Sequence, residues 1–518
     1  MSTSGRVISG SAASWTRIVI TLITQVALVP IYLNYWDVET YGVWLAVQAF
    51  VALMTMLDYG HQTYMGFEFL RFSTLDKATL SKKLWSSVAL QGCTNILQLL
   101  IVLTFIYTGL LPELLSKKDG LSPELLNAAA ISAILQTMLF MLATSLSGMF
   151  VRILEPFGYL PRLAWWNVFL AIVTSCTPPA AIAMGADLVT TTVVLCAAVL
   201  VCSIPYYMDM FSLMKKLDIH IVKPSWSIGF GNFSRSIVLT GRLFLENSRQ
   251  QGIRVVLAPL LGASGLAAFS TMRTGSNVAL QGLNTITNPI MPDLMRFLNA
   301  RDQERSEAAF GTIWIVVIFI LAPAVLVLQA VIAPIFNIWT QGHIEFNPAL
   351  FSLMSLSVLV YAVAQPAVAV VAGNNLLRPQ LIFSIIAGVI AIGGIIVLLP
   401  IMGIVGSGIA LVTAEVAAAI GYALTARAWL KSKSLQWPVR ASVTAATSVA
   451  LTGVIMGAMV MFPDFKYLIC LGGLFILLWN FMRYWKMLPE VLTSQILNYV
   501  SVPVLKKKVF AKFAQFIK

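Results

Sequence analysis

The sequence predicts an all-α polytopic membrane protein with about 14 transmembrane helices. The chain has 518 residues, of which 58% are hydrophobic and only 11% are charged, and its mean hydropathy is +0.85. Soluble domains carry about one quarter charged residues. Only helices and closed barrels satisfy all backbone hydrogen bonds in lipid. The apolar runs here are about 20 residues long and do not alternate with polar residues, which favours helices over a barrel.

Fourteen helices are expected along the chain, separated by turn residues such as Pro259 to Gly262 and Pro400 to Gly403. The expected ranges are 13–34, 41–60, 85–111, 124–149, 163–183, 187–208, 232–258, 262–289, 308–333, 348–371, 380–400, 404–427, 441–462 and 466–484. The first apolar stretch is full length and has no small-residue cleavage site, so no cleavable signal peptide is predicted.

Both termini are predicted to be cytoplasmic. With this orientation most of the 34 Lys and Arg residues fall on the cytoplasmic side, and only Lys117, Lys118 and Lys466 fall on the opposite face. The net charge of +13 thus follows membrane sidedness, which argues against nucleic-acid binding. The basic tail is expected to be either an amphipathic helix on an anionic membrane surface or a solvated segment.

A faint internal repeat predicts two parallel six-helix lobes around a central cleft, followed by two additional helices. The segment "GMFVRILEPFGYLPRL" resembles "AVVAGNNLLRPQLIF", so that Pro161 aligns with Pro379. Six helices per copy is an even number, so both copies have the same orientation. The predicted divisions are an N-terminal lobe (1–208), a cytoplasmic linker (209–231), a C-terminal lobe (232–427), two further transmembrane helices (428–484) and a basic cytoplasmic tail (485–518).

Composition argues against several classes of function. The five cysteines fall mostly inside apolar runs and the three histidines are scattered, so neither a disulfide framework, a metal site nor a cofactor is expected. No "GxxxxGK[ST]" motif occurs, which argues against ATP use by this chain. None of the predicted external loops is long enough for a separate active site, so the protein is not expected to be an enzyme.

The predicted seventh helix, 232–258, carries an unusual charged face. At 100° per residue, Arg235, Arg242, Glu246 and Arg249 lie within about 60° of one another. Each charge at the centre of a membrane helix costs about 2.5 to 3.5 kcal/mol on an insertion scale. This face must therefore look into protein or a water-filled cleft. Arg254 lies on another side of the same predicted helix and is expected to be peripheral.

Polar stripes on two further predicted helices are expected to line the same cleft. The eighth carries Arg273, Asn277 and Gln281 on a face about 80° wide, and the first carries Arg17. A neutral stripe in the third, which comprises Gln91, Asn95 and Gln98, is interpreted mainly as hydrogen bonding between helices.

Carboxylates within the predicted spans are fewer than the arginines. Asp58, predicted to lie near a membrane border, Glu246 and Glu415 are the candidate partners. Asp58 and Glu415 could each pair with an arginine or take part in ion coupling, and Glu415 in particular could sense protons or bind a coupling ion. The remaining positive surplus indicates an anionic ligand, and guanidinium groups suit phosphate oxygens.

Two segments of the chain resemble a known transporter family. The first runs "VPIYLNYWDVETYGVWLAVQAFVALMTMLDYG" and the second runs "LLGASGLAAFSTMRTGSNVALQGL". Together with the helix count they are similar to the O-antigen and polysaccharide flippases of the multidrug/oligosaccharidyl-lipid/polysaccharide exporter superfamily. The resemblance implies a flippase of the bacterial inner membrane that moves an oligosaccharide linked to undecaprenyl diphosphate. It also implies alternating access between two lobes, with Arg17, Arg242, Arg249 and Arg273 contacting the headgroup.

The resemblance also implies partners, and it leaves alternative functions open. Membrane lipids, a polysaccharide polymerase and chain-length machinery are the expected partners. A lipid II flippase and a multidrug or cation antiporter of the same superfamily are alternatives, although an antiporter would favour acidic cavity residues. A membrane glycan polymerase or ligase is the alternative from another class, and such an enzyme would need a large external catalytic loop.

Overall fold

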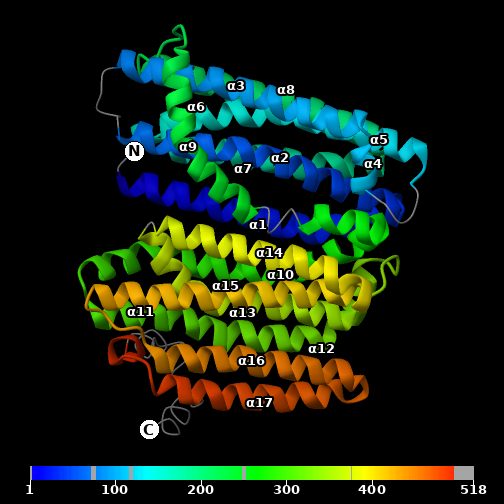
Figure 1. Ribbon diagram of the computed structural model, residues 1–518, viewed down its shortest axis with the longest axis vertical. Coiled ribbons are helices and arrows are strands. Elements are labelled where there is room, and N and C mark those ends of the chain that lie inside the picture. Colours follow the sequence, from blue (N-terminus) through cyan, green and yellow to red (C-terminus); the bar gives the residue numbers. More distant parts are fainter. Residues whose placement is uncertain (1–2, 72–76, 116–120, 248–252, 375, 495–518) are drawn as a thin grey trace. The chain divides into compact units, whose positions relative to one another are not determined.

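The computed structural model describes residues 3–71, 77–115, 121–247, 253–374 and 376–494 (Figure 1). Within these ranges the regular elements are helices, and no strand occurs. The predicted all-α fold class is therefore confirmed.

The first half of the chain contains ten α-helices, one π-helical turn and one 3-10 turn among its described residues. These are α1 (Thr3–Tyr35), α2 (Val38–Arg71), α3 (Lys77–Tyr107), α4 (Leu110–Leu115), α5 (Pro123–Leu139), η1 (Phe140–Ser145), α6 (Leu146–Leu154), η2 (Glu155–Phe157), α7 (Leu160–Ala183), α8 (Leu188–Lys216), α9 (Trp226–Asn247) and α10 (Ile253–Asn299).

The second half is built in the same way from long helices. Its described elements are α11 (Gln303–Ile315), η4 (Val316–Leu321), α12 (Ala322–Trp339), α13 (Pro348–Gly373), α14 (Leu377–Met402), α15 (Ile404–Ser432), α16 (Val439–Met461), η5 (Pro463–Phe465) and α17 (Lys466–Trp485). The η4 turn is π-helical, and it joins α11 to α12 without a loop.

Side-chain caps fix where several helices begin. Asp187 accepts a hydrogen bond from the backbone N–H of Thr190 at 2.8 Å and starts α8. Asn347 caps α13 in the same way, and Pro348 follows at the first helical position, where its missing N–H is not needed. These short polar residues satisfy N–H groups that a helix start otherwise leaves without a partner.

Twelve helical segments among the described residues are long and apolar enough to cross a membrane. They include α5 to η2 as one segment, and α11 to α12 as another, because the π-helical turns continue the helix. Neither α1 nor α9 is among the twelve. The multi-span architecture is thus confirmed, and the count of about fourteen spans stays a prediction.

The predicted helix 232–258 is seen only in part. Helix α9 ends at Asn247 and α10 begins at Ile253, and residues 248–252 lie outside the described residues. A continuous helix over 232–258 therefore stays a prediction. Arg254 lies at the start of α10, where it is half-buried beside Tyr41.

The predicted helix boundary at Gly262 agrees with the backbone. Gly262 has φ 74° and ψ 174°, a non-helical conformation that glycine adopts readily, and α10 is made of two helices joined across this residue. The expected turn from Pro259 to Gly262 thus appears as a kink in α10.

The end of the second helix differs from the prediction. Helix α2 continues to Arg71, well beyond the predicted end at residue 60. Asp58 therefore lies inside the long apolar segment Val38–Leu70, and its place near a membrane border stays a prediction. The carboxyl group needs protein partners, because lipid cannot hydrogen-bond to it.

The helices form two compact units by their contacts. One unit comprises Met1–Thr271 with Ile338–Glu345, and the other comprises Met272–Asn337 with Phe346–Lys518. In the first unit α9 packs against α2 and α3. These two units are defined by helix packing in a single conformation. They do not test the predicted boundaries of the six-helix lobes, which stay a prediction.

Each unit has its own apolar core. The first unit packs α2, α3, α6 and α8 around fully buried Met65, Phe150 and Met210. In the second unit Trp314 is buried and donates its indole N–H to the Val363 carbonyl oxygen at 3.0 Å. These cores hold the helices that carry the polar side chains described next.

Candidate functional site

A buried polar cluster among the described residues of the first unit centres on Asp58 of α2. Its Oδ2 atom accepts three hydrogen bonds, from Gln62 Nε2 at 2.6 Å, Gln91 Nε2 at 2.8 Å and Ser145 Oγ at 2.7 Å. Asn95 joins through its Nδ2 atom, which lies 2.8 Å from Ser145 Oγ. All five side chains are buried. We name this group the Asp58 cluster.

The cluster leaves two acceptor oxygens without a donor. Both Asp58 Oδ1 and Gln91 Oε1 are buried and have no hydrogen-bond partner in the described structure. Two turns beyond Gln91 on α3, Gln98 is buried with neither of its side-chain polar atoms bonded. Buried polar groups are normally paired, so unpaired acceptors at one place point to a ligand or a proton.

A π-helical turn brings Ser145 into the cluster. Ser145 is the last residue of η1, which lies between α5 and α6. The hydroxyl of Tyr207 on α8 lies 2.8 Å from the Leu142 carbonyl oxygen and 3.0 Å from that of Ala143, so a neighbouring helix supports the irregular turn. The Ser145 carbonyl oxygen accepts from Gln91 Nε2 at 2.8 Å. Turns of this kind occur frequently at functional sites in helices.

A second polar layer lies between α2, α3 and α9. His61 Nδ1 and Ser236 Oγ are 3.3 Å apart, and Asn232 Nδ2 donates to Ser87 Oγ at 3.3 Å. A Cβ atom on Gly60 would lie 2.3 Å from the Cα of Thr240, so α2 and α9 approach at backbone distance. The α9 helix, which carries the predicted cleft arginines, is therefore docked on the helix of Asp58.

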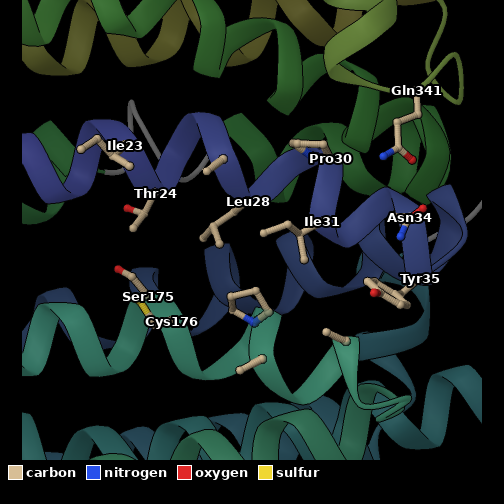
Figure 2. Close-up of a pocket in the computed structure, with 14 residues that line it drawn as sticks. Ile23, Thr24, Leu28, Pro30, Ile31, Asn34, Tyr35, Ser175, Cys176 and Gln341 are labelled. Atoms are coloured by element: carbon tan, nitrogen blue, oxygen red, sulfur yellow. The ribbon is translucent and has the colours of Figure 1, made fainter.

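An open groove lies between α1 and α7 (Figure 2). Its cavity volume is about 600 Å³, and small side chains such as Ala27 and Ala180 leave room between the helices. The groove is mostly apolar, with Asn34, Tyr35 and Gln341 together in one region of it. Its shape and lining suit an elongated apolar chain.

Arg17 lies on the same face of α1 as the groove. Eight residues of α1, from Ile23 to Tyr35, line the groove, and their angular positions span about 160°, a range that includes Arg17. Arg17 is exposed and lies about 10 Å along the helix axis before Thr24. Helix α1 thus carries a guanidinium group and, further along the same side, the apolar groove.

The remaining predicted site residues are distributed over both units. Arg235 is exposed on α9 of the first unit, whereas Arg273 and Asn277 are half-buried on α10 in the second. Glu415 is half-buried on α15, and both it and Arg273 take part in interactions. The side chains of Arg242, Glu246 and Gln281, and all of Arg249, lie outside the described residues. Convergence of these arginines on one cleft stays a prediction.

Sequence analysis missed two members of the Asp58 cluster. Gln62 lies one turn after Asp58, a spacing that could have identified it. Ser145 carried no such signal, because its position depends on a π-helical turn. For Gln91 and Asn95 the predicted hydrogen bonding between helices is confirmed.

No family model matches the chain, and no curated protein matches its sequence. Solved structures do match its fold, which is that of transporters of the MOP superfamily. At 14 or 15% sequence identity these similarities establish the fold, and with it a multi-pass helical membrane protein.

One similar structure is the lipid II flippase MurJ in an inward closed conformation. It is 14% identical, has a TM-score of 0.64, and the match covers 92% of this chain and 99% of MurJ. An inward-facing MATE family multidrug resistance transporter is 15% identical, with a TM-score of 0.57 and coverages of 81% and 95%. A MOP superfamily transporter from Pyrococcus furiosus, noted for the reverse polarity of its binding pocket, is 14% identical, with a TM-score of 0.51 and coverages of 83% and 96%.

Proposed function

We propose that the protein is a flippase that moves a polyprenyl-diphosphate-linked oligosaccharide from the cytoplasmic to the external leaflet of a bacterial inner membrane. The observation that carries this proposal is the alignment of Arg17 with the apolar groove along one face of α1. A guanidinium fork binds phosphate oxygens, and the groove accommodates part of an isoprenoid chain. A polyprenyl-diphosphate-linked oligosaccharide carries both an anionic diphosphate and an apolar isoprenoid chain.

Two further observations support a lipid-linked anionic substrate. One of the proteins with a similar fold is a lipid II flippase. The predicted spans also carry more arginines than carboxylates, and Asp58 is engaged by Gln62, Gln91 and Ser145 and by no described arginine. We infer that four arginines contact the diphosphate as it crosses the membrane: Arg235, Arg242, Arg249 and Arg273. The polar residues beside them in this site would be Glu246, Asn277 and Gln281. Both termini would be cytoplasmic.

Alternating access supplies the mechanism. The cleft would open first to the cytoplasm and then to the other side, and the substrate must interact differently with the two states to shift their populations. A lipid II flippase fits the same fold and the same chemistry. A multidrug or cation antiporter shares the fold but would favour an acidic cavity. A glycan polymerase or ligase lacks any supporting observation.

Arginine variants test the proposal in a host that lacks its own O-antigen flippase. Arg17→Ala, Arg242→Ala, Arg249→Ala and Arg273→Ala should each lower surface glycan and raise the lipid-linked intermediate, while Arg427→Ala, an exposed residue on α15, should do neither. Normal surface glycan in all four variants at wild-type protein levels would overturn the proposal. Rescue of a host depleted of its lipid II flippase, without rescue of O-antigen export, would identify lipid II as the substrate.

A further inference from the structure

The linker that joins α8 to α9 is fixed along the start of α3. The backbone N–H of His220 donates to Ser81 Oγ at 3.1 Å. The backbone N–H of Ser225 donates in the same way to Ser86 Oγ at 2.8 Å. The Trp85 indole N–H donates to the His220 carbonyl oxygen at 3.0 Å. Because three hydrogen bonds to one helix hold the linker in place, the side chains that point away from α3 form a preformed surface.

The end of α8 directs the linker onto α3. Asp218 has φ 56°, the left-handed conformation that often follows a helix. The backbone N–H of Asp218 donates to the Lys215 carbonyl oxygen at 3.2 Å. That of Ile219 donates to the Met214 carbonyl oxygen at 3.0 Å, and the two bonds together close the last turn of α8. Ile219 is buried in the core of the first unit, so the linker starts from an anchored residue.

Three large apolar side chains on the outer side of this segment are exposed. Ile221 of the linker is 74% exposed, and Trp226 and Phe230 of α9 are 54% and 57% exposed. The ring centroids of Trp226 and Phe230 lie 6.4 Å apart, so the two rings form one surface. The buried side of α9 is polar instead, because Asn232 contacts α3 and Ser236 contacts α2. A polar inner face and an apolar outer face indicate that the outer face contacts lipid.

Three exposed lysines accompany these apolar side chains: Lys215, Lys216 and Lys223. They take part in no ion pair within the described part of the chain. The sequence from Lys215 to Trp226 contains these three lysines and one acidic residue, Asp218, so its net charge is +2 with histidine counted as neutral. Lysines attract anionic headgroups, and aromatic rings settle at the membrane interface. We use the name linker patch for the three lysines together with Ile221, Trp226 and Phe230.

We propose that the linker patch binds anionic phospholipids at the membrane surface, on the side predicted to be cytoplasmic. The lysines contact the phosphate groups, and the three apolar side chains enter the adjacent acyl region. The apolar face continues along α9 to Ile237, which is 53% exposed and lies within about 40° of Trp226 and Phe230. A bilayer covers such a continuous face, and this favours lipid over a partner protein. Because α9 packs against α2 and α3, lipid bound here holds the start of α9 on α3 (Figure 1).

Lysine acetylation of the purified full chain in lipid nanodiscs tests the proposal, with the rate at each lysine measured by mass spectrometry. In phosphatidylcholine nanodiscs Lys215, Lys216 and Lys223 should react freely. Phosphatidylglycerol should slow each of them about fivefold, which is the gain in affinity expected for one lysine at an anionic surface. High salt should reverse this protection, because it screens charges at the surface. Soluble glycerol phosphate should not protect, since it has no acyl chain for the apolar side chains.

Variants of the apolar side chains separate lipid binding from simple charge attraction. Ile221→Asn combined with Phe230→Asn keeps every lysine and should remove most of the protection by phosphatidylglycerol. Ile221→Asn alone changes one highly exposed linker residue, so it serves if the double variant does not fold, and it should weaken the protection. Met184→Asn replaces an 89% exposed residue just before the start of α8, at the other end of that helix, and should keep the protection.

Three outcomes would overturn the proposal. The first is equal acetylation rates in the two kinds of nanodisc, and the second is full protection in the Ile221→Asn variants. The third is protection by glycerol phosphate, or by a cytoplasmic protein fraction, without any effect of phosphatidylglycerol. The readout involves neither transport nor glycan, so the proposal does not depend on the result of the arginine variants.

Discussion

The Ser145 hydroxyl donates a hydrogen bond to Asp58 Oδ2 at 2.7 Å across 87 residues of sequence. This bond joins the π-helical turn η1 to α2 inside the first unit. Ser145→Ala would leave the buried carboxyl group with one donor fewer, and we expect a loss of about 1–3 kcal/mol in unfolding free energy. Thermal unfolding in detergent measures it. Thr94→Ala, which removes only a bond to the Gln91 carbonyl oxygen on the same helix, should cost less. Equal effects would contradict the proposed importance of the bond.

Unlike Ser145, Gln98 has a buried polar side chain without a hydrogen-bond partner in the described structure. We expect Gln98→Leu to stabilise the protein or leave it unchanged, since it removes two unpaired polar atoms at similar volume. Asn95→Leu, one turn earlier, breaks the bond to Ser145 and should destabilise it. Melting temperatures of the two variants provide the comparison. A strongly destabilised Gln98→Leu protein would mean that Gln98 has a partner after all.

The approach of α9 to α2 depends on Gly60. A methyl group there would lie 2.2 Å from Thr240 Oγ1 and 2.3 Å from its Cα, so the helices must move apart. We expect Gly60→Ala to lower stability by about 1–3 kcal/mol, as overpacking does. Gly92→Ala on α3 meets nothing within 4 Å and should stabilise slightly through helix propensity. Similar melting temperatures for both variants would show that α9 docks more loosely than described.

Asp187 makes one helix start sensitive to pH. Hydrogen bonds from the Thr190 hydroxyl and backbone amide hold the pKa of this carboxyl group below its ordinary value. The stability that they add is fully present above the unfolded-state pKa of about 4 and is lost as the pH falls through the lower folded-state value. Asp187→Ala should cost about 1 kcal/mol at neutral pH, and Asp187→Asn should retain the cap and remove this pH dependence. Melting temperatures measured from acid to neutral pH check both outcomes.

Filling the groove between α1 and α7 should impair transport if it holds the isoprenoid chain. Ala27→Trp and Ala180→Trp place bulky side chains in the cavity, one from each helix. We expect each to lower surface glycan roughly tenfold, which corresponds to about 1.4 kcal/mol of lost binding. Val201→Trp on α8, an exposed apolar position outside the groove, serves as the control. Wild-type export in both groove variants would exclude the groove as the tail site.

The all-α membrane fold was predictable from the sequence, because the requirement for internal hydrogen bonding in lipid acts on each apolar run separately. Helix ends were less predictable. The kink at Gly262 coincides with the turn expected from Pro259 to Gly262. Helix α2, in contrast, continues to Arg71, because hydropathy does not resolve how far a helix extends beyond its most apolar stretch.

Which polar residues belong together was decided only by tertiary structure. The stripe of Gln91 and Asn95 on α3 could be seen in the sequence, and so could Asp58 on α2. Their meeting with Ser145 could not, because it requires three packed helical segments and a π-helical turn that rotates one hydroxyl into the bundle. Helical periodicity fixes the face on which a side chain lies. The packing of neighbouring helices fixes what that face contacts.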